Sequence, residues 1–96
     1  MRTERMGIRV RFAGAILEQT GGETTSQVVG ATVRDVLERL FLRHPTLRFC
    51  LFHPDDPNRV RALAHVFHNA KEVRDAQDLA TPVKDGDELT ITADVA

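Results

Sequence analysis

The stretch KDGDELTITADVA, residues 84–96, predicts a turn followed by a strand. Asp85 and Gly86 are turn formers, and apolar and polar side chains alternate after them. The apolar set is Leu89, Ile91, Ala93 and Val95. A period of two buries one face of a strand and leaves the other in water. We therefore expect a half-buried strand here, the last in the sequence.

Residues 8–12, IRVRF, show the same alternation, with Arg9 and Arg11 on the wet face. Gly21 and Gly22 supply the positive backbone angles of a reversal, so residues 24–29 are predicted to return as an antiparallel strand. The first and last strands are the two most regular. We expect them to lie side by side at the centre of the sheet, which requires a parallel pair with a long crossover between them.

Residues 33–44 predict the main helix of that crossover. The stripe with helical spacing consists of Val33, Val36, Leu37, Leu40, Phe41 and His44. Thr32 is expected to cap the first turn, with Asp35 completing a capping box. Pro45 ends the helix, and His44 is predicted to hydrogen-bond the last carbonyls.

The second half of the chain gives weaker signals. Residues 53–59 are turn formers without periodicity and predict a surface loop. Residues 62–68 predict a third strand, followed by a turn at Asn69. Together the elements predict an α+β fold of the β-grasp, or ubiquitin-like, type, with a mixed sheet packed on one main helix. We expect one such domain over residues 1–96, with residues 1–6 as a candidate disordered stretch.

Composition excludes several classes of function. The formal net charge is -1 and the chain has no Trp or Tyr to stack on bases, so we expect no nucleic-acid binding. The sequence has no apolar run long enough to span a membrane and no signal-peptide pattern, so a cytoplasmic protein is expected. No nucleophile, glycine-rich phosphate or cofactor motif is present, and we predict neither an enzyme nor a bound cofactor.

The cysteine and the histidines give no metal or redox motif. Cys50 lies in an apolar stretch and is predicted to be a buried, inert thiol. His65 and His68 are three apart in a predicted strand, so they point to opposite faces and cannot share an ion. His53 lies in the predicted loop near Asp55 and Asp56, where spacing matches no zinc or calcium motif.

Three stretches together resemble a known family: residues 10–47, residues 66–75 (VFHNAKEVRD) and residues 81–96 (TPVKDGDELTITADVA). The landmarks are Gly30-Ala31-Thr32-Val33, His44-Pro45, Asn69, Pro82 and Asp85-Gly86-Asp87-Glu88. Their order and spacing resemble the MoaD/ThiS group of ubiquitin-like sulfur carriers, which includes carriers of the CysO type. The resemblance implies a partner that is a ubiquitin-activating-type adenylyltransferase or a sulfur-accepting enzyme. The pathways implied are molybdopterin, thiamine, cysteine or natural-product biosynthesis.

The same resemblance directs attention to the C-terminal tail. Family members end in Gly-Gly, whose carboxylate is adenylated and converted to a thiocarboxylate, whereas this sequence reads Asp94-Val95-Ala96. It is either a shortened carrier, a protein that acts only as a binding module, or a user of another C-terminal chemistry. Two missing residues shorten the reach of a tail by about 7 Å. We therefore predict that the 96-residue form does not carry sulfur.

Leu63 and Phe67 are the candidate partner interface. They lie on one face of the predicted third strand with His65, opposite Ala64 and Val66. The sheet face away from the helix is the usual docking surface of ubiquitin-like proteins. A place in the core, or in a dimer contact, is the alternative for these two residues. Sulfur carriage is the predicted function, a ubiquitin-like interaction module without carrier activity is the alternative, and the oligomeric state is open.

Overall fold

The computed structural model of the chain describes residues 7–93. The predictions for residues 1–6 and for the tail, residues 94–96, fall outside this range. In chain order the elements are β1 (Ile8–Gly14), the 3-10 helix η1 (Ala15–Glu18), β2 (Thr25–Val28), α1 (Val33–Arg43), α2 (Leu47–Leu51), β3 (Phe52–His53), β4 (Asp56–Val60), β5 (Ala64–His68), β6 (Lys71–Val73), α3 (Ala76–Leu79) and β7 (Glu88–Ala93).

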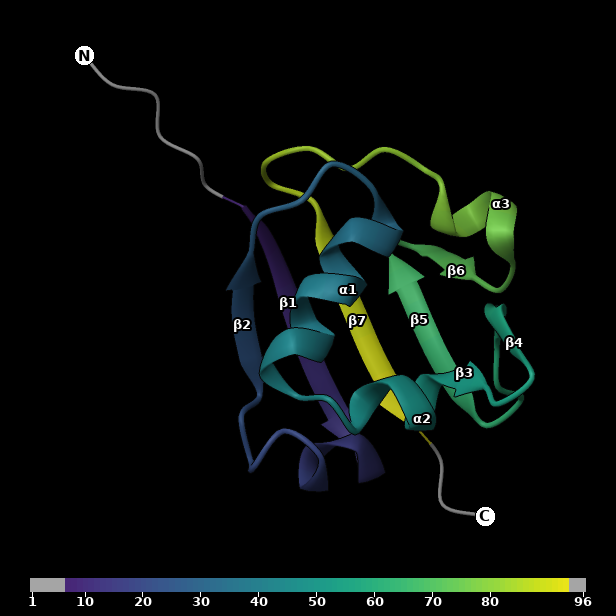
Figure 1. The fold of residues 1–96 in the computed structure, drawn as a ribbon. Helices are drawn as coiled ribbons and strands as arrows, with labels where there is room; N and C mark the ends of the chain where they lie inside the picture. Colours follow the sequence, from purple (N-terminus) through teal and green to yellow (C-terminus); the bar gives the residue numbers. More distant parts are fainter. Residues whose placement is uncertain (1–6, 94–96) are drawn as a thin grey trace.

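Five strands form one sheet in the order β2-β1-β7-β5-β6. β1 and β7 pair in parallel, from Arg9 opposite Glu88 to Gly14 opposite Ala93. All other pairs in this sheet are antiparallel. The prediction that the first and last strands are central and parallel is confirmed. With α1 crossing one face of the mixed sheet, the chain has the β-grasp fold (Figure 1).

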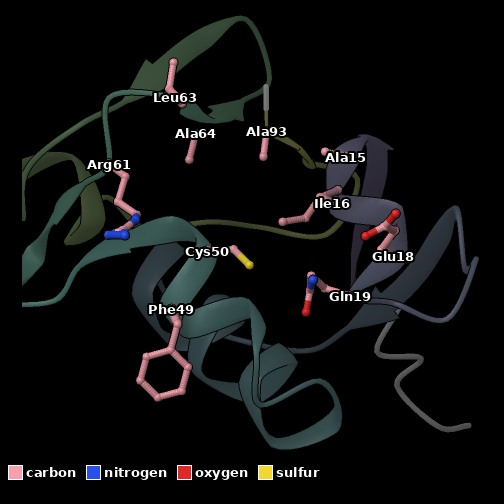
Figure 2. A pocket seen from close by; sticks show the side chains of 10 residues that line it. All are labelled: Ala15, Ile16, Glu18, Gln19, Phe49, Cys50, Arg61, Leu63, Ala64 and Ala93. Carbon is pink, nitrogen blue, oxygen red and sulfur yellow. The ribbon is translucent and has the colours of Figure 1, made fainter. Parts of the chain in front are cut away.

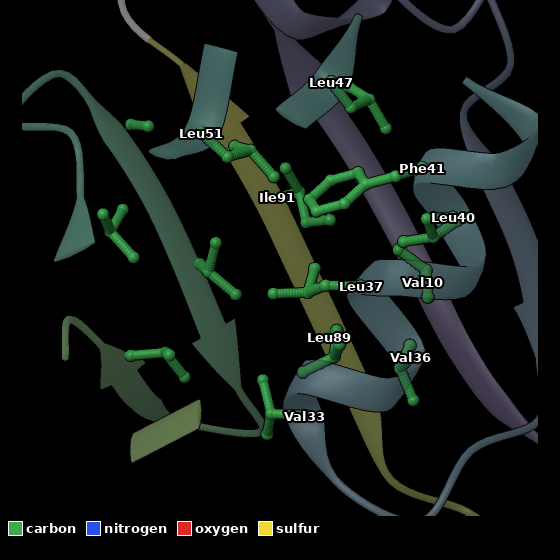
Figure 3. Close-up of a cluster of buried hydrophobic side chains, with 14 of the residues drawn as sticks. Val10, Val33, Val36, Leu37, Leu40, Phe41, Leu47, Leu51, Leu89 and Ile91 are labelled. Atoms are coloured by element: carbon green, nitrogen blue, oxygen red, sulfur yellow. The ribbon is translucent and has the colours of Figure 1, made fainter. Parts of the chain in front are cut away.

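The apolar stripe of α1 packs on the inner face of the sheet (Figure 3). Its buried members are Val33, Val36, Leu37, Leu40 and Phe41. Across from them lie Val10 of β1 and Leu89 and Ile91 of β7, all without exposed surface. Full burial of one such side chain stabilises the fold by about 1.5–3 kcal/mol. Packing on the two central strands, rather than helix propensity, therefore holds α1 in place.

The start of α1 is capped much as predicted. Thr32 Oγ1 accepts a hydrogen bond from the Asp35 backbone N–H at 3.1 Å. The Asp35 carboxylate accepts from the Ala31 N–H at 2.9 Å, one residue before the Thr32 N–H that a capping box would use. The first bond satisfies a backbone donor that the helix itself leaves unpaired, and the second satisfies the N–H of the residue before the cap.

The prediction for His44 was wrong. Its ring does not serve the last carbonyls of α1, because Nε2 lies 2.9 Å from Glu23 Oε1. The ring also packs edge-on against Phe12 of β1, with centroids 6.2 Å apart. His44 belongs to the apolar stripe, which turns its ring toward the sheet.

The prediction of a loop over residues 53–59 was also wrong. β3 and β4 form a small hairpin in which Phe52 lies opposite Val60, and both side chains are buried. Arg34 of α1 holds the hairpin, since its guanidinium donates to the Pro57 carbonyl at 3.2 Å and to the Asn58 side chain. The polar residues of this stretch show no strand pattern, because the hairpin depends on contacts with α1.

Other differences concern short elements and boundaries. The sequence did not predict α2, β6, α3 or η1, and the third strand begins at Ala64 rather than at residue 62. Gly21 and Gly22 have positive φ angles of 68° and 91° as expected, but η1 lies between them and β1, so the reversal is wide. Asn69 has φ 57°, which confirms the predicted left-handed turn.

Candidate functional site

The outer face of the sheet, on the side away from α1, is not covered by any helix of residues 7–93 (Figure 1). Arg9 and Arg11 of β1 are exposed there, as the alternation predicted. Arg11 Nη1 lies 3.7 Å from Glu88 Oε2 of β7, an exposed ion pair that contributes little to stability. The face is therefore accessible and mixed in charge.

Leu63 and Phe67 both lie outside the hydrophobic core. Leu63 is 46% exposed and belongs to the turn before β5 rather than to the strand. Phe67 is half-buried on the outer face of β5, whereas Ala64 and Val66 of the same strand are fully buried. The burial of Leu63 and Phe67 argues against a place in the core, and the partner interface and the dimer contact stay predictions for these two residues.

Phe67 has polar neighbours on the same face. Its ring stacks on that of His65, with centroids 6.3 Å apart and planes inclined by 16°. Glu72 of β6 lies directly opposite Phe67, and its Oε2 accepts from His65 Nδ1 and from Arg74 Nη1, each at 3.0 Å. The His65 hydrogen bond is the main cause that holds the pKa of Glu72 below its ordinary value. Arg74 lowers this pKa further, whereas partial desolvation of the carboxylate acts in the opposite direction and raises it.

A hollow of about 530 Å³ opens at the end of β7, between η1 and α2 (Figure 2). Ile16, Cys50, Ala64 and Ala93 point into it. Most of these side chains are small, so the core is not filled at this end of the sheet. Cys50 is half-buried, and the prediction of a buried thiol was wrong to that extent. Phe49 lies at the rim with 69% of its surface exposed.

The strand that leads to the tail ends beside this hollow. Ala93, the last described residue, pairs with Gly14 of β1 on one side and with Ala64 of β5 on the other. The predicted tail residues Asp94, Val95 and Ala96 lie outside the described residues. The position from which the tail leaves the sheet is thus defined by two neighbouring strands.

Comparison with protein-family models identifies the family to which this chain belongs. The model of the ThiS family matches residues 10–93. The chain belongs to the ThiS family. ThiS-family sulfur carriers are protein substrates and not enzymes, so the chain is not an enzyme.

Individual relatives agree with the family. The sulfur carrier protein CysO of Mycobacterium bovis is 28% identical over 91 residues, which cover 95% of this chain and 98% of CysO. The crystal structure of Mycobacterium tuberculosis CysO is 26% identical with a TM-score of 0.81, covering 93% of this chain and 100% of that one. A chain of the Amycolatopsis orientalis BexX/CysO complex is 30% identical with a TM-score of 0.77, covering 94% of this chain and 98% of that one.

At the opposite end of β7, a buried carboxylate in this ThiS-family chain holds the turn before the strand. Asp87 accepts from His68 Nε2 at 2.9 Å, from the Lys84 backbone N–H at 3.0 Å and from Asn69 Nδ2 at 3.4 Å. The His68 bond is the main cause that keeps the pKa of Asp87 below its ordinary value. His68 hydrogen-bonds the carboxylate of Asp87, and His65 hydrogen-bonds that of Glu72.

Within residues 7–93, no three His, Cys, Asp or Glu side chains gather as ligands for a metal ion. Nor does this part of the chain contain a helix with the length and hydropathy needed to cross a bilayer.

Sequence reasoning missed Glu72 and Arg74 because it did not predict β6. The two residues alternate around the buried Val73, but a strand of three residues is too short to show a clear period of two. Their proximity to Phe67 depends on the register between β5 and β6, which the sequence alone does not give.

Proposed function

We propose that this ThiS-family protein carries sulfur as a thiocarboxylate on a tail that ends in the two glycines of the family, for the synthesis of a cofactor or metabolite. The position of β7 is the observation that carries the proposal: it lies between β1 and β5 and ends at Ala93. A strand paired on both sides fixes the point at which the tail begins. A fixed starting point reduces the conformational freedom lost when the tail enters an active site.

The proposed chemistry has two steps at the terminal carboxylate. The carboxylate oxygen attacks the α-phosphorus of ATP, pyrophosphate leaves, and an acyl adenylate forms. A sulfur nucleophile at the oxidation level of sulfide then attacks the acyl carbon, and AMP leaves with the electron pair of the broken bond. No side chain of the carrier reacts, which agrees with its role as a substrate. The use of ATP supports our expectation of a cytoplasmic protein.

We assign the docking of the ubiquitin-activating-type adenylyltransferase, or of the sulfur-accepting enzyme, to Leu63 and Phe67. Both side chains lie outside the core, and an aromatic or aliphatic anchor that enters a pocket of the partner is a typical centre of a binding interface. Leu63 also precedes Ala64, the residue paired with Ala93. A partner that covers Leu63 would therefore cover the start of the tail. The BexX/CysO complex supports the idea that such a protein binds a second one.

A ubiquitin-like interaction module is the second candidate. The accessible outer face with Leu63 and Phe67 favours it, because binding through this face requires no chemistry at the tail. The two candidates share the docking surface and differ only in whether sulfur is transferred.

Intact-mass measurement separates them. The 96-residue chain and a form extended by two glycines are incubated with ATP, sulfide and the adenylyltransferase of the same genome. The carrier proposal expects the exchange of one oxygen for one sulfur in the extended form. If both forms bind the enzyme and neither acquires sulfur, the interaction module replaces the carrier.

A further inference from the structure

We propose that Glu72 organises the docking face by positioning Phe67 through His65 and Leu63 through Arg74. The inference rests on the docking function proposed above and adds residues that need not touch the partner. Glu72 Oε2 is the common acceptor, since His65 Nδ1 and Arg74 Nη1 both donate to it at 3.0 Å. We call Glu72, His65 and Arg74 the Glu72 cluster.

One side of the Glu72 cluster reaches Phe67. The hydrogen bond to Glu72 fixes the rotation of the His65 ring about its side-chain bonds. The Phe67 ring then lies nearly parallel to it, with planes 16° apart and centroids 6.3 Å apart, within the range of favourable ring contacts. Glu72 also stands directly across the strand pair from Phe67. The orientation of the aromatic anchor is thus set by the carboxylate through His65.

The other side of the Glu72 cluster reaches the turn that carries Leu63. Arg74 Nη1 donates to the Ala64 carbonyl at 2.9 Å, and Nη2 donates to the Arg61 and Val60 carbonyls at 3.1 and 3.2 Å. These carbonyls stand on both sides of Leu63 in the chain. A planar guanidinium can bind several carbonyls in fixed directions, which the single ammonium of lysine cannot do.

The exposure of the Glu72 cluster argues against a purely structural role. The side chains of His65, Glu72 and Arg74 keep 32%, 37% and 37% of their surface exposed. Ion pairs at such positions contribute little to the stability of a fold. Their effect on Leu63 and Phe67 is different, because holding the two anchors in place before binding lowers the entropy lost on association.

The test measures the affinity of the full chain for the adenylyltransferase by isothermal titration calorimetry. Glu72→Gln removes the charge at the common acceptor, and Arg74→Lys removes the planar donor. We expect each to weaken binding roughly three- to tenfold, the range of about one hydrogen bond. Glu72→Gln should leave the melting temperature unchanged, whereas Arg74→Lys should lower it, because it also removes hydrogen bonds from the guanidinium to backbone carbonyls.

Glu38→Gln is the matched control on the opposite side of the molecule. Glu38 of α1 also binds two arginines, Arg48 at 2.6 Å and Arg34 at 3.5 Å, and its side chain is 38% exposed. This control should leave the affinity unchanged, because Glu38 supports neither Leu63 nor Phe67.

Double-mutant cycles decide whether the Glu72 cluster acts through the anchors. In a chain that carries both Phe67→Leu and Leu63→Ala, Glu72→Gln should change the affinity by less than about twofold, and the same holds for Arg74→Lys in a Leu63→Ala chain. Effects as large as in the wild-type chain would overturn the inference. A wild-type chain that does not bind would instead overturn the docking function, and the inference with it.

Discussion

Replacing Asp87 with alanine tests how the turn before β7 is held. The Asp87 side chain is 10% exposed and accepts from His68 Nε2 at 2.9 Å and from the Lys84 backbone N–H at 3.0 Å. A hydrogen bond to a charged group contributes about 1.5–3 kcal/mol. The His68 side chain is 14% exposed, so in the alanine variant water can replace part of the hydrogen bonding that His68 loses with Asp87. We expect the free energy of unfolding to fall by about 2–4 kcal/mol, measured by urea denaturation at neutral pH.

The lowered pKa of Asp87 adds an acid dependence to this prediction. A depressed carboxyl pKa means that folding favours the ionised form, so the stabilisation is complete above the ordinary value of 3.8 and is lost as the pH falls through the lowered value. The wild-type chain should therefore lose stability in acid more steeply than Asp87→Ala. Asp55→Ala, at an exposed position, is the control and should cost less than about 0.5 kcal/mol. A loss below about 1 kcal/mol for Asp87→Ala, or an unchanged acid slope, would refute the reasoning.

Three further substitutions test the core, a turn and the docking face. Leu37→Ala should lower the free energy of unfolding in urea by about 2–5 kcal/mol, because its side chain is buried in the core. Leu42→Ala, at a position 84% exposed, is the control and should lower it by less than about 0.5 kcal/mol. Equal losses for the two variants would contradict the packing of α1. Asn69→Gly should be more stable than Asn69→Ala by about 1 kcal/mol in the same assay, because alanine is strained at a φ of 57°, and the opposite order would be inconsistent with this turn. Phe67→Ser should keep the circular dichroism of the wild type and bind the adenylyltransferase at least about tenfold more weakly, while a loss of the fold would return Phe67 to the core.

The fold was predictable because its decisive elements follow simple periods. Arg9 and Arg11 alternate with buried residues in β1, and the same rule holds for Leu89 and Ile91 in β7. The helical stripe of α1 met every expectation except that for His44, whose ring turns to the sheet. These patterns reflect one buried face per element, which is a property of the local sequence.

The remaining elements depend on partners that are distant in the sequence. The β3 and β4 hairpin is held by Arg34 of α1, and no pattern within residues 53–59 records that contact. The same holds for the candidate site: the sequence placed Phe67 on a face, but its pairing with Glu72 follows from strand register. The half-burial of Cys50 likewise follows from the hollow between η1 and α2, which depends on tertiary packing.

The most direct test of sulfur carriage is the intact mass of the chain extended by two glycines, after incubation with ATP, sulfide and the adenylyltransferase of the same genome. The account predicts a product in which one sulfur replaces one oxygen, and a C-terminal fragment spectrum that assigns the change to the terminal carboxylate. An unchanged mass, under conditions in which a ThiS-family carrier acted on by its own adenylyltransferase is converted, would contradict it.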